Sequence, residues 1–282
     1  MIPYIQVHPI HLGPLTLQPF GVLVGAGIIL GVTLATRRAK KLGLDPEILQ
    51  SFMWWVLVGG FVGGHVLDAL LYHPAEVAAR PWALLNIWEG LSSFGGFVGA
   101  VLGALAWKRY RVHKGKPVVA ILPYCDAVQS IFPIAWIFGR AGCAVVHDHP
   151  GALAPASSWL AVAYGPGTGE GYGLFDLQHG IVPRYDLGLL EMLFAIILSI
   201  AFVATWNRRL PVGSYLVAAS LSYAPVRFAL DFLRATDLEG ADPRYGHLTP
   251  AQWACIGMFA FGLLLWRHIR AQGEAQKQLA PA

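Results

Sequence analysis

The sequence predicts an all-α polytopic membrane protein with seven transmembrane helices. Three observations lead to this fold class: 56% of the 282 residues are hydrophobic, only 13% are charged, and several apolar runs extend for about 20 residues. Soluble domains carry roughly 25% charged residues, and a helix needs about 20 apolar residues to cross the hydrocarbon core. We therefore expect one integral membrane domain over residues 1–282.

The seven expected helices are, in order, residues 17–36, 49–72, 92–110, 119–140, 189–206, 213–234 and 250–268. Fourteen of the 20 basic residues lie in or beside the connections after the first, third, fifth and seventh helices, which all open to the same side. The positive-inside rule makes that side cytoplasmic. The N-terminus is then expected outside and the C-terminus in the cytoplasm.

The remaining six basic residues are all arginines, and all six lysines fall on the expected cytoplasmic side. These arginines are Arg80, Arg140, Arg184, Arg227, Arg234 and Arg244. A planar guanidinium group forms paired hydrogen bonds with phosphate or carboxylate. The split therefore predicts an anionic ligand on the outer side. We expect no nucleic-acid partner, because the net charge of +4 reflects membrane topology.

The connection over residues 141–188 is expected to form a periplasmic head or lid within the membrane domain. It is rich in Gly, Pro and Tyr (AYGPGTGEGYGLF) and lacks the apolar periodicity of another span. It begins in the stretch 139–151, GRAGCAVVHDHPG, where an apolar helix closes with Arg140. A charged group at membrane depth indicates a site. A snorkelling arginine followed by a polar turn is the simpler alternative.

The sixth span carries Arg227, Asp231 and Arg234 at positions i, i+4 and i+7, which share one face of a helix. We interpret them as a phosphate clamp that faces Arg140, with Asp231 holding either arginine in place. A buried ion pair that locks helices together is the structural alternative. At the start of the third span, the free N–H groups around Gly95 and Gly96 favour an anion.

These features together resemble bacterial prolipoprotein diacylglyceryl transferases over nearly the whole chain. Residues 139–151 resemble the family signature G-R-x-G-N-F-x-N-G-E-x-x-G, and residues 93–99 (SFGGFVG) resemble S-F-H-G-G-L-I-G. Residues 227–234 (RFALDFLR) are similar to R-x-x-x-E-F-x-R. The family resemblance implies transfer of diacylglyceryl from phosphatidylglycerol to the lipobox cysteine thiol of a prolipoprotein, releasing glycerol-1-phosphate. It also implies a site at the periplasmic leaflet of the bacterial inner membrane, in contact with membrane lipids and the prolipoprotein signal peptide.

The resemblance assigns roles to residues at matching positions. Arg140 and Arg227 would bind the lipid phosphate, and Asp148 would stand for the signature glutamate. Gly142 and Gly151 would shape the signature turn. The remaining expected substrate-binding residues are Arg234, Gly95 and Gly96, and the supporting acidic residues are Asp126, Glu191 and Asp231. The family implies no cofactor and no metal.

Several positions depart from the family pattern. Its histidine before Gly-Gly is Phe94 here, its first-helix tyrosine is Phe20, its signature asparagine is Cys143 and its second-helix G-G-R arginine is His65. His147 and His149, which flank Asp148, are expected to supply the proton transfer instead, because neutral histidine is the usual base near neutral pH.

Three alternatives stay open: a paralogue with another acceptor, a lipid hydrolase or head-group transferase built on residues 147–149, and a non-catalytic phospholipid-binding protein. A metal at residues 147–149 is not expected, since three consecutive residues rarely present three ligands to one ion.

Overall fold

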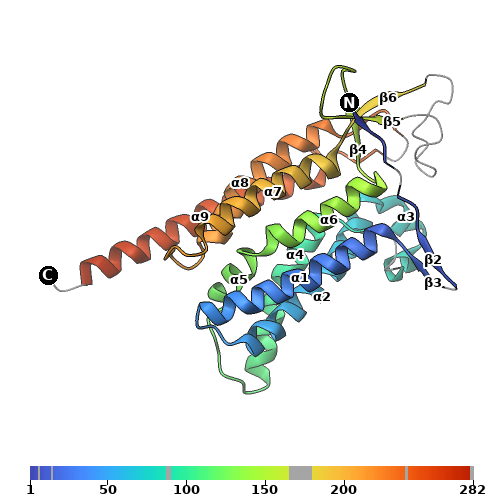
Figure 1. The fold of residues 1–282 in the computed structure, drawn as a ribbon. Helices are drawn as coiled ribbons and strands as arrows, with labels where there is room; N and C mark the ends of the chain where they lie inside the picture. The colour runs from blue at the N-terminus through green and yellow to red at the C-terminus, as the bar shows by residue number, and fades with distance from the viewer. Residues whose placement is uncertain (6, 14, 87–89, 165–179, 239–240, 280–282) are drawn as a thin grey trace. The chain divides into compact units, whose positions relative to one another are not determined.

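The computed structural model describes residues 1–5, 7–13, 15–86, 90–164, 180–238 and 241–279, most of them helical (Figure 1). The chain divides into two compact units. Unit 1 comprises residues 1–33, 130–208 and 222–242. Unit 2 comprises residues 34–129, 209–221 and 243–282.

Five helices among the described residues are long and apolar enough to cross a membrane. They are α1 (Pro19–Lys41), α2 (Pro46–Tyr72), α7 (Leu187–Thr205), α8 (Ser214–Leu230) with its short continuation η2 (Asp231–Leu233), and α9 (Pro250–Leu279). The expected span 119–140 is instead two helices, α5 (Ile121–Gln129) and α6 (Phe132–Val146), which together make a sixth, interrupted candidate. The chain is therefore a multi-pass membrane protein.

The expected third span forms the helix α4 (Ser93–His113), which is not among these candidates. Its many glycines and the basic residues Lys108 and Arg109 lower its hydropathy. The described helices thus account for five or six of the seven expected spans.

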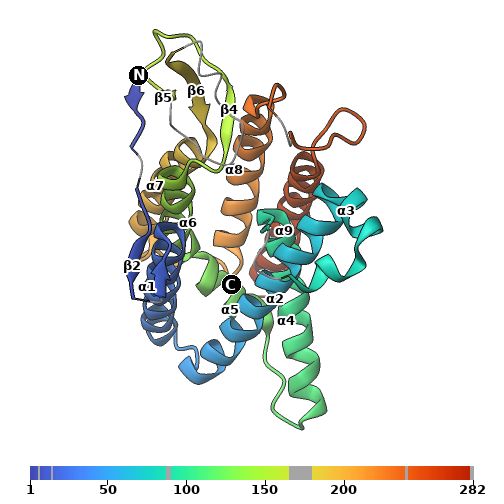
Figure 2. The ribbon, with the colours of Figure 1, turned by 90° about the vertical axis from the view of Figure 1, so that its right-hand side faces the viewer.

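The structure corrects the all-α prediction, because unit 1 contains a four-stranded sheet with the order β1-β5-β6-β4. The strands are β1 (Ile2–Pro3), β4 (Pro150–Leu153), β5 (Ala161–Tyr164) and β6 (Val182–Asp186). They lie side by side beyond the ends of α6 and α7 (Figure 2). A separate antiparallel hairpin joins β2 (Ile10–Leu12) to β3 (Leu15–Leu17). The connection is too polar for another span, so its backbone groups pair between strands instead.

The sheet lies in the expected head over residues 141–188. α6 continues to Val146, so the head begins one to two turns later than expected, and Cys143 lies on the helix. β1 pairs with β5 in parallel, with Ile2 opposite Val162, so the N-terminal residues belong to the sheet as well. Residues 165–179, which hold most of the Gly-rich stretch, lie outside the described residues.

In unit 2, α2 and α4 pack through facing glycines (Figure 1). A Cβ atom added at Gly63 would lie 2.5 Å from the Cα atom of Gly99, and one added at Gly95 would lie 2.5 Å from the carbonyl oxygen of Gly63. Small residues of this kind let two helix backbones approach closely in a membrane. The N–H group of Gly95 donates to Ser92 Oγ at 3.3 Å, so Ser92 caps α4. The structure thus gives Gly95 a packing role.

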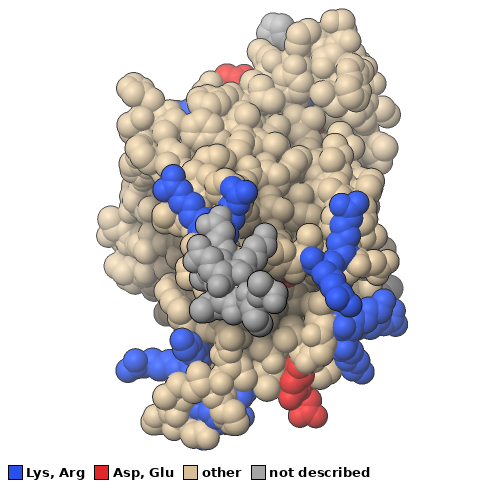
Figure 3. Space-filling model, turned by 90° about the vertical axis from the view of Figure 1, so that its left-hand side faces the viewer, with Lys and Arg blue, Asp and Glu red and all other residues tan. Residues whose placement is uncertain are grey.

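The basic connections belong almost wholly to unit 2, since all fourteen of their Lys and Arg residues except Arg208 fall in it. Figure 3 shows a face on which Lys and Arg side chains predominate and Asp and Glu are scarce. Unit 2 also holds Arg80 and Arg244, two of the arginines expected on the outer side.

Asp126 of α5 caps the start of α8 within unit 2. Its Oδ1 atom accepts hydrogen bonds from the backbone N–H groups of Tyr215 at 2.8 Å and Leu216 at 3.1 Å. Asp126 is 9% exposed. A side-chain oxygen at this place satisfies backbone donors that the helix itself leaves unpaired.

We expect Asp126→Ala to destabilise the protein by about 1 kcal/mol, the usual cost of losing an N-cap. Asp126→Asn is the matched variant, because its amide oxygen can still accept both bonds, and it should lose less. Thermal unfolding of the detergent-solubilised protein measures the difference. A variant that kept its melting temperature but lost activity would contradict this structural role and would indicate that Asp126 takes part in the reaction.

Candidate functional site

Arg140 on α6 and Arg227 near the end of α8 converge on one carboxylate, that of Glu191 on α7. The Nε atom of Arg140 lies 3.1 Å from Oε1, and the Nε atom of Arg227 lies 3.6 Å from Oε2. Both arginines are 4% exposed and Glu191 is 2% exposed. All three belong to unit 1. The two predicted phosphate ligands therefore share one buried location.

Two further side chains hold the Glu191 carboxylate in place. The hydroxyl group of Tyr223 donates to Oε1, and Trp136 Nε1 donates to the same oxygen at 3.2 Å. The guanidinium carbon of Arg140 lies 4.7 Å from the centre of the Trp136 ring. The sequence analysis missed both aromatic residues. Helical spacing could have indicated them, because Trp136 precedes Arg140 by four residues and Tyr223 precedes Arg227 by four.

Asp231 links the two arginines of the sixth span. Its Oδ1 atom lies 2.5 Å from Arg227 Nη1 and 3.0 Å from Arg234 Nε, although the α-helix gives way to η2 at this residue. Arg234 also pairs with Asp242, at 2.9 Å between Nη1 and Oδ2. Each arginine of the clamp thus has a carboxylate partner. The alternative interpretation, a buried ion pair with a structural role, therefore describes part of the arrangement. A guanidinium group carries five N–H donors, so pairing with one carboxylate is compatible with binding an anion as well.

The signature turn begins at His147, which ends α6 in the left-handed conformation with φ 51°. Its Nδ1 atom lies 2.7 Å from Asp186 Oδ2, and its Nε2 atom lies 3.3 Å from the carbonyl oxygen of Ile5. Its ring stacks on Tyr4 with centroids 4.0 Å apart. Both ring nitrogens of His147 therefore contact residues of the head. This position differs from the one expected of a residue that transfers a proton to or from substrate.

Asp186 orders the junction of the head with α7. It caps the helix by accepting from the N–H group of Leu189 at 2.9 Å, and it accepts from Tyr164 Oη at 3.3 Å. Burial raises the pKa of Tyr164 above its ordinary value, and the charge of Asp186 adds to this. Tyr164 therefore stays protonated and keeps donating to Asp186. These contacts give His147 a scaffolding environment.

The left-handed turn brings Asp148 and His149 beside the last turn of α6. A sulfur, oxygen or nitrogen atom from each of Cys143, Asp148 and His149 lies within 4.8 Å of the other two. His149 Nδ1 contacts Asp148 Oδ1 in a short hydrogen bond. Arg140 Nη1 lies 3.7 Å from Cys143 Sγ, so this trio adjoins the arginines. Asp148 and His149, both predicted from the sequence, therefore lie with Cys143 beside Arg140, one of the two predicted phosphate ligands.

The signature glycines permit close packing in unit 1. A Cβ atom at Gly142 would lie 2.9 Å from the ring of Phe20. One at Gly151 would lie 2.7 Å from the carbonyl oxygen of Leu233, the residue before Arg234. Gly188 fits against α6 in the same way, 2.9 Å from the Cβ atom of Cys143. These glycines position the backbone around the cluster.

Arg184 of β6 ties the head to the segment after η2. It forms a paired contact with Asp237, at 3.0 Å between Nη1 and Oδ1 and 2.5 Å between Nη2 and Oδ2. Nη1 also donates to the carbonyl oxygen of Gly151 at 3.0 Å. The hydrogen bonds from Arg184 hold the pKa of Asp237 below its ordinary value.

We expect Asp237→Asn to destabilise the protein at neutral pH by less than about 1 kcal/mol, because the carboxylate is 46% exposed and solvent screens the pair. A lowered folded-state pKa gives stability above the unfolded value of about 3.9, and that stability is lost as pH falls through the folded value. The melting temperatures of wild type and variant should therefore converge as the pH falls below about 4. A difference that stayed constant with pH would contradict this account.

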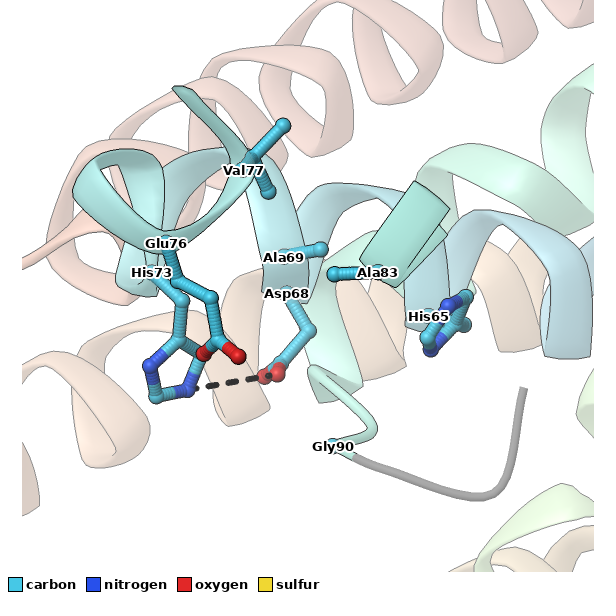
Figure 4. A pocket seen from close by; sticks show the side chains of 8 residues that line it. All are labelled: His65, Asp68, Ala69, His73, Glu76, Val77, Ala83 and Gly90. Carbon is cyan, nitrogen blue, oxygen red and sulfur yellow. Dashed lines mark ion pairs between the residues drawn. The ribbon is translucent and has the colours of Figure 1, made fainter. Parts of the chain in front are cut away.

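Unit 2 contains a cavity of about 180 Å³ whose polar lining includes His65, Asp68, His73 and Glu76 (Figure 4). Asp68 pairs with His73 at 3.7 Å between Oδ2 and Nε2, and His65 Nε2 lies 3.2 Å from the carbonyl oxygen of Leu84. No lysine or arginine lines it among the residues that the structure describes. Its carboxylates would repel phosphate, so the arginine cluster fits an anionic ligand better.

Comparison with known proteins places the chain in a family. The sequence model described as prolipoprotein diacylglyceryl transferase matches residues 8–268. The chain belongs to this family. It is 30% identical to the phosphatidylglycerol–prolipoprotein diacylglyceryl transferase of Pseudomonas putida (strain KT2440), covering 96% of this chain and 97% of the relative. It is 28% identical to the protein of that name from Nitratidesulfovibrio vulgaris (strain Miyazaki F), covering 98% of both chains.

The signature turn of this prolipoprotein diacylglyceryl transferase family member departs from the motif quoted above. Cys143 stands where the resemblance has asparagine, and it contacts Arg140. Phe94 stands at the position of the family histidine and packs in unit 2 against Phe97, with centroids 5.9 Å apart. Arg140 and Arg227 thus match the quoted family motifs, whereas Cys143 and Phe94 do not.

Proposed function

We propose that this chain transfers the diacylglyceryl group of phosphatidylglycerol to the lipobox cysteine thiol of prolipoproteins and releases glycerol-1-phosphate. The observation that carries the proposal is that Arg140 and Arg227, each only 4% exposed, converge on the carboxylate of Glu191. The chain also belongs to this family. The names of the relatives supply both substrates.

Arg140 and Arg227 would bind the lipid phosphate, with Arg234 at the rim of the clamp. Arg234 is the more accessible of the three, with 18% of its side chain exposed. During the reaction the thiolate sulfur forms a bond to the glyceryl carbon, the bond from that carbon to the phosphate oxygen breaks, and the electron pair stays on that oxygen. Preorganised cations in a site that excludes water stabilise the developing charge most effectively.

The acceptor thiol must lose its proton, because the thiolate is the nucleophile. We assign this step to the trio of Cys143, Asp148 and His149, since Asp148 and His149 keep 24% and 26% of their side chains exposed beside Arg140. His147 would support the turn through Asp186.

The proposed setting is the bacterial inner membrane. We propose that α4 completes seven spans and that the chain forms one membrane domain, with the N-terminus outside and the C-terminus in the cytoplasm. Residues 141–188 would form a periplasmic head or lid, with the active site toward the periplasmic leaflet. The supporting observation is the distribution along the sequence, because fourteen of the 20 basic residues lie in or beside the connections after the first, third, fifth and seventh expected helices.

A family paralogue with a different acceptor is the second candidate. The departures at Phe20 and Phe94 favour it, because phenylalanine stands where the family pattern has tyrosine and histidine.

Complementation of a transferase-depleted bacterium, followed by mass spectrometry of its lipoproteins, tests the proposal. We expect lipobox cysteines to carry diacylglyceryl and growth to be restored. Purified protein that binds phosphatidylglycerol but modifies no lipobox peptide would overturn the proposal. Modification of a different thiol would support the paralogue instead.

A further inference from the structure

Cys143, Asp148 and His149 have the composition of a metal site. Thiolate, carboxylate and imidazole are the three ligand types that bind Zn²⁺ in proteins, and the presence of sulfur disfavours Mg²⁺ and Ca²⁺. The three donor atoms lie within 4.8 Å of one another. Zinc–ligand bonds of about 2.0–2.3 Å place tetrahedral ligands roughly 3.3–3.7 Å apart. Side-chain adjustments of about one ångström would therefore close the trio around one ion, which would replace the hydrogen bond between Asp148 and His149.

These ligands differ from the three consecutive residues that the sequence presented. His147 is turned into the head, where Asp186 and Ile5 occupy its two ring nitrogens. Cys143, one turn earlier on α6, takes its place in the cluster because the left-handed residue His147 reverses the chain. The spacing of the motif is thus Cys-x4-Asp-His.

The surroundings fit a metal-bound thiolate. Arg140 Nη1 lies 3.7 Å from Cys143 Sγ and would donate to the bound sulfur, as outer partners of metal ligands commonly do. Zn²⁺ with one thiolate and one carboxylate is electrically neutral, so it does not add net charge beside Arg140, whose own charge faces Glu191. Cys143 is 7% exposed, whereas Asp148 and His149 keep about a quarter of their side chains exposed. The open side of the trio is therefore the carboxylate and imidazole side.

We propose that Cys143, Asp148 and His149 bind Zn²⁺ and that the fourth position takes the acceptor thiol. Three protein ligands with one open position are the arrangement of catalytic zinc sites. A thiol that binds the ion loses its proton, which passes to water, and the resulting thiolate lies beside the arginines that hold the lipid phosphate. The sulfur then attacks the glyceryl carbon, and the phosphate oxygen leaves with the bonding electrons. This zinc proposal rests on the proposed transferase function and specifies how the acceptor thiol is activated.

Zinc content and cobalt spectroscopy test the site without reference to activity. The full chain is purified in detergent, loaded with Zn²⁺ or Co²⁺ alone and desalted. We expect one equivalent of zinc per chain and, with cobalt, a near-ultraviolet thiolate-to-metal band. Cys143→Ser should lose the band, and His149→Gln should weaken zinc binding on the order of tenfold or more. Cys125→Ser is the matched control, since Cys125 belongs to unit 2, and it should retain both signals.

The outcomes separate the two proposals. Melting temperatures check that the variants fold, and His149→Gln guards against misfolding of Cys143→Ser because His149 is partly exposed. Less than stoichiometric zinc, or the same cobalt spectrum in wild type and Cys143→Ser, would overturn the metal site. Full transfer by chelated, metal-free protein would also overturn it and would assign His149 as a general base. Stoichiometric zinc without transfer to any lipobox peptide would support the metal site and overturn the proposed function.

Discussion

Arg140→Gln and Arg227→Gln are each expected to reduce the rate of diacylglyceryl transfer to a lipobox peptide by about 10²–10³-fold. Both guanidinium groups are buried and share the Glu191 carboxylate, so each would contact the same phosphate. The negative charge on the departing phosphate oxygen grows in the transition state. The loss of a hydrogen-bond donor to this oxygen should therefore lower kcat more than it raises KM.

Lysine variants separate charge from geometry. Arg140→Lys and Arg227→Lys keep a positive charge but lose the planar pair of donors, so we expect intermediate rates. Arg80→Ala is the matched control, because Arg80 is an exposed arginine on the same predicted side of the membrane, and its rate should equal that of wild type. Wild-type rates in both glutamine variants would remove the arginines from the reaction.

The arginines, Asp231 and Glu191 could be named from the sequence, but the pairing of Glu191 with both arginines could not. Asp231 was predictable because it lies four residues after Arg227, and helical periodicity alone brings them together. Glu191 is 51 residues from Arg140 and 36 from Arg227, so only the packing of α6, α7 and the end of α8 makes it their common partner. Local pattern carries no information on such long-range pairing.

The head shows the same limit. Its polar and Gly-rich composition predicted a head outside the membrane, and the structure places a sheet in this connection. No local pattern indicated that Ile2 would pair with Val162, since that pairing depends on how the chain returns after 160 residues. The left-handed backbone at His147 could have been inferred from the quoted signature, which has at this position a glycine, the residue that adopts this conformation most readily. That one residue decides that Cys143 and not His147 joins the trio.

Glu191→Leu is expected to destabilise the protein by about 3–5 kcal/mol, the usual cost of leaving a buried charge without its partner. Glu191 faces Arg140 and Arg227 and accepts from Tyr223 and Trp136, so the variant removes a carboxylate from both buried cations and an acceptor from two donors, while Arg227 keeps its pair with Asp231. Glu191→Gln keeps an oxygen for the two donors and should lose less. Glu76→Gln, at an exposed glutamate of the helix α3 (Pro74–Ala79), is the control and should leave the melting temperature unchanged.

Two further measurements connect Glu191 to the ligand. The double variant Glu191→Gln with Arg140→Gln should lose less unfolding free energy than the two single variants lose together. Each single variant leaves a buried charge without its partner, whereas the double variant removes both charges. Strict additivity would show that the two side chains do not interact. If the arginines bind lipid phosphate, phosphatidylglycerol should raise the melting temperature of Glu191→Gln more than that of wild type, since the phosphate then replaces the missing negative charge. An equal rise in both proteins would place the lipid elsewhere on the molecule.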